Sequence, residues 1–137
     1  MGSESANNLL IDANVILRFL LNDDHALFVQ AKKLFQKAKR GTYTMYIEEV
    51  TIAEVVWVLT STYEYPKTQI VDKLKKLLTP NWIVNPKKQH LIDALDLFAQ
   101  HSLAYIDCWL FVISKSQNLT LTTFDKKLAS LSRKVSP

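Results

Sequence analysis

The sequence predicts an α/β sandwich built around a mainly parallel central sheet. Short apolar segments rich in β-forming residues alternate along the chain with longer segments whose apolar residues repeat at helical spacing. The connections between the expected strands are too long for hairpins, which favours parallel pairing. With 137 residues, 48% of them hydrophobic, the chain is long enough for one domain with its own core.

The first half of the chain is expected to form two strands and three helices. The strands cover residues 8–12 and 43–47, and the helices cover residues 14–21, 25–39 and 49–61. Apolar residues recur at helical spacing in the second helix, and Gly41 follows it as a stop signal. The third helix has too many apolar residues for a surface helix, so we expect it to be buried on most sides.

The second half is expected to begin with a helix opened by Pro66, whose apolar stripe consists of Ile70, Val71, Leu74, Leu77 and Leu78. Strands should follow at residues 82–84 and 119–123, and helices at residues 87–100, 106–117 and 125–131. We expect residues 1–7 to be a flexible leader and residues 8–137 to form a single domain.

The composition excludes several kinds of site. The one cysteine, Cys108, excludes a disulfide framework and a thiolate zinc site, and the three histidines show no metal-ligand spacing. With two glycines, the chain has no phosphate-binding loop of the P-loop or dinucleotide type. No signal peptide or bilayer-spanning apolar run is found, so we expect a cytoplasmic protein. A net charge of +4 gives mild support for a polyanionic partner.

Four acidic residues lie among apolar neighbours, where an unpaired carboxylate is costly. Asp12 follows LLI, Glu54 lies within TIAEVVWVL, Asp107 lies within LAYIDCWLFVI, and Asp125 ends LTLTTFD. Three of them have a structural explanation: Asp12 and Asp125 can cap helices, and Asp107 can lie in a first helical turn. Glu54 falls in the middle of a helix, where no cap is needed.

Considered together, the four acids predict a metal site. In open parallel sheets a site lies beyond the carboxyl ends of the strands, and Asp12 and Asp125 follow the first and last expected strands. Glu54 and Asp107 come from helices that can point to the same edge. Four carboxylates in one pocket repel each other unless a cation is present, and oxygen-only ligands select Mg²⁺ or Mn²⁺. Such ions suit phosphoryl chemistry.

In this order, the residues resemble those of the PIN-domain ribonucleases, especially the VapC-type toxins of prokaryotic toxin–antitoxin pairs. LLIDANVILRFLLNDD is similar to the family's opening strand and first acid, and EVVWVL, YIDCWL and LTTFDKKL resemble the segments of the other three acids. The resemblance covers residues 9–131. It implies a three-layer α/β/α sandwich with about five parallel strands, and cleavage of RNA to a 3′-hydroxyl and a 5′-phosphate.

The resemblance also implies a role for each site residue. Asp12 and Asp107 would bind Mg²⁺ or Mn²⁺ directly, and Glu54 and Asp125 directly or through water. The acids or the attacking water would be oriented by two polar residues, Asn14 and Thr123. The implied partners are an antitoxin protein, which places an arginine among the carboxylates, and a second copy of the chain in a homodimer.

Three basic residues are candidates for RNA contact. Lys126 and Lys127 adjoin Asp125, and Arg18 lies one helical turn beyond Asn14, where it can reach either the pocket or an acidic partner. The remaining basic helix faces are expected to be solvated. Trp57, Trp109 and Cys108 are expected in the core.

The sequence departs from the family pattern in two places. Cys108 and Trp109 follow Asp107 where the family usually has small residues, which could narrow the pocket, and SRKVSP leaves little chain for a final edge strand. Among other enzymes, a haloacid-dehalogenase-type phosphatase needs an aspartate where Asn14 stands, and a response-regulator receiver needs an acidic pair at the first strand. A catalytically inert nucleic-acid-binding or protein-binding module on the PIN scaffold stays open.

Overall fold

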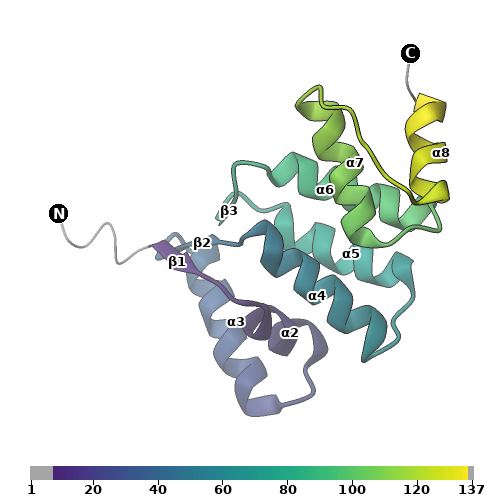
Figure 1. Ribbon diagram of the computed structural model, residues 1–137. Helices are drawn as coiled ribbons and strands as arrows, with labels where there is room; N and C mark the ends of the chain where they lie inside the picture. Colours follow the sequence, from purple (N-terminus) through teal and green to yellow (C-terminus); the bar gives the residue numbers. More distant parts are fainter. Residues whose placement is uncertain (1–7, 136–137) are drawn as a thin grey trace.

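The computed structural model describes residues 8–135, so the leader expected at residues 1–7 lies outside it. In chain order the elements are β1 (Asn8–Leu10), α2 (Ala13–Leu21), α3 (His25–Lys39), β2 (Thr44–Tyr46), α4 (Glu49–Ser61), α5 (Lys67–Leu78), β3 (Ile83–Val84), α6 (Lys88–Gln100), α7 (Tyr105–Ser116) and α8 (Lys126–Val135). Figure 1 shows helices grouped around short strands. None of the helices in residues 8–135 is long and apolar enough to cross a membrane.

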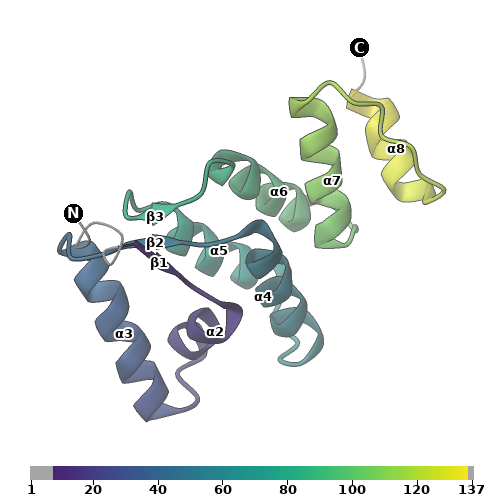
Figure 2. The ribbon, with the colours of Figure 1, turned by 60° about the vertical axis from the view of Figure 1, so that its left-hand side comes forward.

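The strands form a parallel sheet in the order β1-β2-β3, which confirms the predicted α/β class. Leu9 lies opposite Met45, and Met45 lies opposite Ile83. Residues 8–135 contain three strands, so the expectation of about five strands is wrong for this part of the chain. In Figure 2 the strands are seen nearly edge-on, with α2 and α3 on one side of them.

Helix boundaries follow local capping chemistry. Asp12 accepts a hydrogen bond from the backbone N–H of Val15 and caps α2, and Asp24 caps α3 through the N–H of Leu27. Gly41, just beyond α3, has a φ of 91°, a left-handed conformation that favours glycine. Pro66 stands immediately before α5, as the sequence predicts.

The core is formed by the strands and by buried residues from every helix, with the largest share from α4, α5, α6 and α7. Met45 and Ile83 are at most 1% exposed, and all five residues of the predicted α5 stripe are buried. The prediction for α4 is only partly right, because Ile52, Val55, Val56 and Leu59 are buried. Val50 and Trp57, on its other face, are 73% and 67% exposed. The prediction that Trp57 is a core residue is therefore wrong.

The chain beyond α7 lies apart from the sheet. We call residues 117–135 the C-terminal arm; it comprises a connecting segment and α8. The strand predicted at residues 119–123 is not formed: Leu119 is 58% exposed and Phe124 is fully exposed. Both views place this segment on the side of α7 away from β1 (Figures 1 and 2). The Leu119 N–H donates to the Ser114 carbonyl at 2.8 Å, but within the described residues no strand pairs with this segment.

The edge of β1 facing away from β2 is also without a strand neighbour in the described part of the chain. Leu10 on this edge is 70% exposed. An open edge and an unpaired apolar segment therefore occur in the same structure, and α7 lies between them (Figure 2). Open edges of this kind readily accept another strand.

Candidate functional site

The carboxyl end of β1 carries the first predicted site residue. Ile11 is buried, and the chain then passes through Asp12 into α2. The Asp12 side chain is exposed, and its Oδ1 accepts the hydrogen bond from the Val15 N–H at 3.0 Å. This cap occupies one carboxylate oxygen, so capping is compatible with a second ligand on the same group.

The four acids lie on four different helices that contact one another in a row. Asp12 is at the start of α2, the exposed Glu54 is in the middle of α4, and the half-buried Asp107 is in the first turn of α7. Asp125 caps α8, since its Oδ1 accepts from the Leu128 N–H at 2.8 Å. Helix α4 contacts both α2 and α7, and α7 in turn contacts α8.

The structure does not bring these acids into one cluster. Within the described residues, no three His, Cys, Asp or Glu side chains are placed so that they could hold a metal ion. The structural roles anticipated for Asp12, Asp107 and Asp125 are all present. Over the same residues, none of the four acids forms an ion pair with lysine or arginine.

The two predicted supporting residues differ in what they contact. The Thr123 hydroxyl oxygen accepts a hydrogen bond from the Asp125 backbone N–H at 3.0 Å, so it fixes the approach to the last acid. Asn14 is exposed on α2 and lines a small pocket of about 110 Å³ between α2 and α3.

The three candidate RNA-binding residues lie in two places. Arg18 forms an ion pair with Asp23 at 2.8 Å, and the Tyr63 hydroxyl donates to the same carboxylate at 3.2 Å. Lys126 and Lys127 are exposed at the start of α8, and Lys127 Nζ donates to the Ser102 hydroxyl at 3.3 Å. Both lysines line a pocket of about 350 Å³ together with His101, Ser102, Leu103, Ser130 and Leu131.

A fifth carboxylate at this edge was not singled out from the sequence. Glu49 follows β2, and its Oε2 accepts a 2.7 Å hydrogen bond from Nδ2 of Asn85, which is 7% exposed and follows β3. The same Nδ2 donates to the Ile47 carbonyl at 2.7 Å. The hydrogen bond from Asn85 lowers the pKa of Glu49, and Lys87 adds to this effect. Asn85 and Pro86, which follow the third expected strand, were the available sequence signal for this contact, because an Asn-Pro pair marks a turn and this turn falls at the carboxyl edge of the sheet.

The residues after Asp107 do not crowd the exposed face of α7. Cys108 is fully buried and Trp109 is half-buried, which confirms the core prediction for Cys108. Burial raises the pKa of the Cys108 thiol to about 11. The Tyr105 hydroxyl is buried with no hydrogen-bond partner in the described structure, and burial raises its pKa also.

Comparison with known protein families gives a match to the PIN domain over residues 9–134. No curated protein and no solved structure shows significant similarity to the chain. The match spans all four acids and the elements that carry them.

Proposed function

The chain belongs to the PIN domain family, a nuclease-type fold, and from this premise we propose that it is a divalent-metal-dependent endoribonuclease. One observation carries the proposal. The four carboxylates lie on consecutive contacting helices, and within the described residues none is neutralised by a lysine or arginine. Since the protein has a net charge of +4, cationic side chains are available but do not pair with these acids. A divalent cation would supply the missing charge.

The donor set fits a hard cation. Asp12 and Asp107 would hold Mg²⁺ or Mn²⁺, and Glu54 and Asp125 would complete the site directly or through water, because all four offer only oxygen. A bound ion of this kind lowers the pKa of a water molecule and stabilises charge on a phosphate. Thr123 holds the backbone at Asp125, and Lys126 and Lys127, next in sequence, would contact RNA phosphates.

Assembly of the proposed site would need movement of the C-terminal arm and a closer approach of Asp12, Glu54 and Asp107, because these three form no metal-binding group within the described residues either. We propose that residues 119–123 add to the open edge of β1 as a parallel strand, so that Asp125 comes beside Asp12. Exposed apolar side chains support this on both partners: Leu10 on the edge, and Leu119 and Phe124 on the arm. Without a cation, repulsion between the carboxylates opposes closure; with a cation, closure buries apolar surface and satisfies the strand edge.

The biological setting follows from the resemblance. We propose a toxin of a cytoplasmic toxin–antitoxin pair, working as a homodimer and inhibited by an antitoxin that places an arginine among the carboxylates. A mass near 15.7 kDa by light scattering at micromolar concentration would reject the dimer. The separation of the acids favours the second candidate, an inert binding module on the same scaffold.

Cleavage and metal-linked stability test the two candidates. End-labelled total RNA should be cut with Mg²⁺ or Mn²⁺ but not with EDTA, and the products should carry 5′-phosphates because water is the nucleophile. Products with a 2′,3′-cyclic phosphate would contradict the mechanism. An inert module would cut no RNA under any of these conditions.

Thermal melts with and without Mn²⁺ test the ligands. At a hundred times its dissociation constant, the metal should stabilise the wild type by roughly 2.7 kcal/mol. Asp12→Asn and Asp107→Asn should lose most of this shift, whereas Asp93→Asn, an acid on α6 outside the site, should keep it. Equal shifts in all four proteins would refute the four-acid site.

Amide hydrogen exchange tests the movement of the arm. Residues 119–123 should exchange quickly without metal, because they form no strand, and more slowly with Mn²⁺ if they pair with β1. Asp125→Asn should reduce this protection. Exchange that is unaffected by Mn²⁺ in a protein that cleaves RNA would show that closure is not needed.

A further inference from the structure

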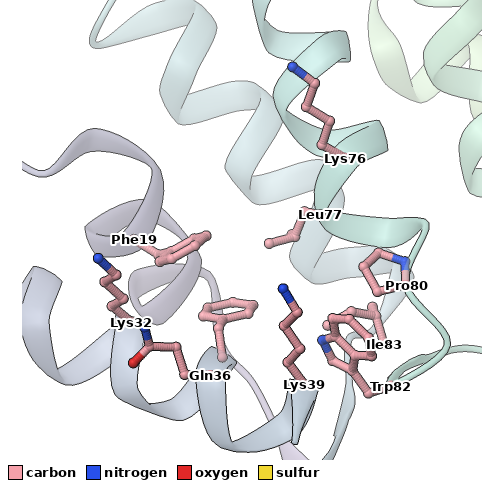
Figure 3. Close-up of a pocket in the computed structure, with 10 residues that line it drawn as sticks. Phe19, Lys32, Gln36, Lys39, Lys76, Leu77, Pro80, Trp82 and Ile83 are labelled. Atoms are coloured by element: carbon pink, nitrogen blue, oxygen red, sulfur yellow. The ribbon is translucent and has the colours of Figure 1, made fainter.

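Another hollow lies at the other end of the sheet from the four predicted acidic residues. We call it the Trp82 groove; it has a volume of about 250 Å³ and is lined by Phe19, Lys32, Phe35, Gln36, Lys39, Lys76, Leu77, Pro80, Trp82 and Ile83. Figure 3 shows side chains from α2, α3, α5 and the segment that leads into β3 around the hollow, with the Lys76 ammonium group pointing away from the others. A neighbouring hollow along the end of α5 shares Lys76, Pro80 and Trp82, so the two hollows adjoin.

The groove is positively charged. Three of its ten lining residues are lysines and none is acidic. Lys76 forms an ion pair with Asp72 at 3.1 Å, but in the described part of the chain Lys32 and Lys39 form none. Lys32 lies 5.9 Å from the centre of the Phe28 ring, and Figure 3 shows Lys39 pointing toward Leu77. The Lys39 ammonium group therefore lies in the groove, and that of Lys32 lies at its edge, beside Phe19 (Figure 3).

Its walls are apolar. The rings of Phe19 and Phe35 stack with their centroids 4.3 Å apart, and Leu77 and Ile83 are 7% and 1% exposed. Apart from the lysines, the polar groups of the lining are the Gln36 amide and the Trp82 indole N–H. These offer few partners for the polar edge of a nucleobase, whose desolvation costs free energy, whereas an apolar side chain has no polar edge to desolvate. The chemistry thus favours a peptide over RNA.

The groove is also separate from the predicted catalytic edge. Trp82 and Ile83 lie at the start of β3, whereas Asp12 follows the end of β1. Because the strands are parallel, these positions are at opposite ends of the sheet. An occupant of the groove would leave the acids accessible.

We propose that the Trp82 groove binds an acidic peptide segment of a partner protein. One large apolar side chain of the segment enters between Phe35, Leu77 and Trp82. Flanking aspartates or glutamates pair with Lys32 and Lys39. This site goes beyond the proposed nuclease function and does not depend on a metal.

Fluorescence anisotropy tests the proposal with a defined probe. The probe is a fluorescein-labelled hexapeptide with leucine and phenylalanine at its centre and glutamates on both sides, and binding is measured in EDTA. Saturable binding should be weakened when serines replace the two apolar residues and when lysines replace the glutamates. Because the metal is absent, failure of the nuclease proposal would not affect this result.

Charge-reversal variants locate the site. Lys32→Glu/Lys39→Glu should weaken probe binding by about tenfold or more, since two ion pairs become repulsive. The matched control is Lys33→Glu/Lys37→Glu, which makes the same change of net charge at exposed positions of α3 outside the groove; it should weaken binding by less than about threefold. Metal-dependent RNA cleavage should be retained in both variants.

Three outcomes would overturn the proposal. The first is the absence of saturable binding to folded wild-type protein. The second is an equal loss in the two double variants, which would indicate general charge attraction. The third is a single-stranded RNA oligonucleotide that displaces the probe and is itself sensitive to Lys32→Glu/Lys39→Glu but not to the control, which would make the groove an RNA site.

Discussion

The part of the molecule from β1 to α6 and the C-terminal arm differ in how they place apolar residues. In the first part the strand residues Met45 and Ile83 and the entire α5 stripe are buried. In the arm, Leu119 is 58% exposed and Phe124 fully exposed, and α8 contributes Leu128 and Leu131 to the core. Both parts have comparable apolar patterns in sequence, so the pattern alone does not decide burial.

The difference shows that a strand depends on its neighbours. Residues 44–46 and 83–84 are shorter than the segment at 119–123, yet they pair because α3 and α5 place them beside β1 and β2. The arm is delivered to the far side of α7 (Figure 1). The exposed face of α4, with Val50 and Trp57, is an exception within the first part.

A core truncation should give the largest contrast between the two parts. Leu74 is fully buried, so Leu74→Ala should lower the free energy of unfolding by about 2–5 kcal/mol. Leu119→Ala in the arm should change it by less than about 0.5 kcal/mol without metal, because the side chain is exposed. Urea unfolding followed by circular dichroism measures both. A large loss from Leu119→Ala would mean that the arm is docked on the sheet.

Truncation of a polar residue at the sheet edge should have the next largest effect on stability. Asn85→Ala removes a buried side chain that donates to the Ile47 carbonyl and to Glu49, so we expect a loss of about 1–3 kcal/mol. Asn81→Ala, at an exposed position of the preceding turn, is the control and should be nearly neutral. Comparable losses in the two variants would contradict the role of Asn85 in linking the ends of β2 and β3.

The cap of α8 should have a smaller and more local effect. Asp125→Ala removes the hydrogen bond to the Leu128 N–H and should destabilise α8 by about 1 kcal/mol, while Asp125→Asn should be nearly neutral without metal. Hydrogen exchange of the α8 amides is the measurement. Faster exchange in α4 as well would show that the arm and the first part unfold together.

The smallest effect should be a change in acid stability. The pKa of Glu49 is lowered in the folded protein, so its contribution is present above the unfolded-state value of about 4.3 and is lost as the pH falls through the folded-state value. Glu49→Gln should therefore flatten the loss of stability below about pH 4. Unfolding curves collected across this range compare it with the wild type, and an unchanged slope would count against the interaction with Asn85.

The sequence predicts local structure well where local rules decide it. Helices at residues 25–39 and 49–61 have the predicted limits, and the α5 stripe is buried as expected. Caps and stop signals act within a few residues, which explains this success. The placement of Trp57 and the strand at residues 119–123 depend on which distant segment covers them, and no local pattern contains that information.

The same limit applies to the candidate site: local features were predicted, and contacts between distant segments were not. The order and element of each acid were predicted, and the helices at Asp12 and Asp107 begin within a residue of the expected positions. Whether the acids meet depends on tertiary placement: within the described residues no three of them form a metal-binding group, and this includes Asp12, Glu54 and Asp107, which lie outside the arm. Glu49 was not singled out from the sequence, because the residue that holds it in the structure, Asn85, is far along the chain.

Because Cys108 is buried, the reactivity of its thiol can report movement of α7. It is the only thiol in the chain, it is fully covered, and its pKa of about 11 leaves little thiolate at neutral pH. An alkylating reagent can therefore react only when α7 separates from the helices behind it. Mass spectrometry of the modified protein would give the modified fraction over time, and from it the rate of these separations, without any engineered label.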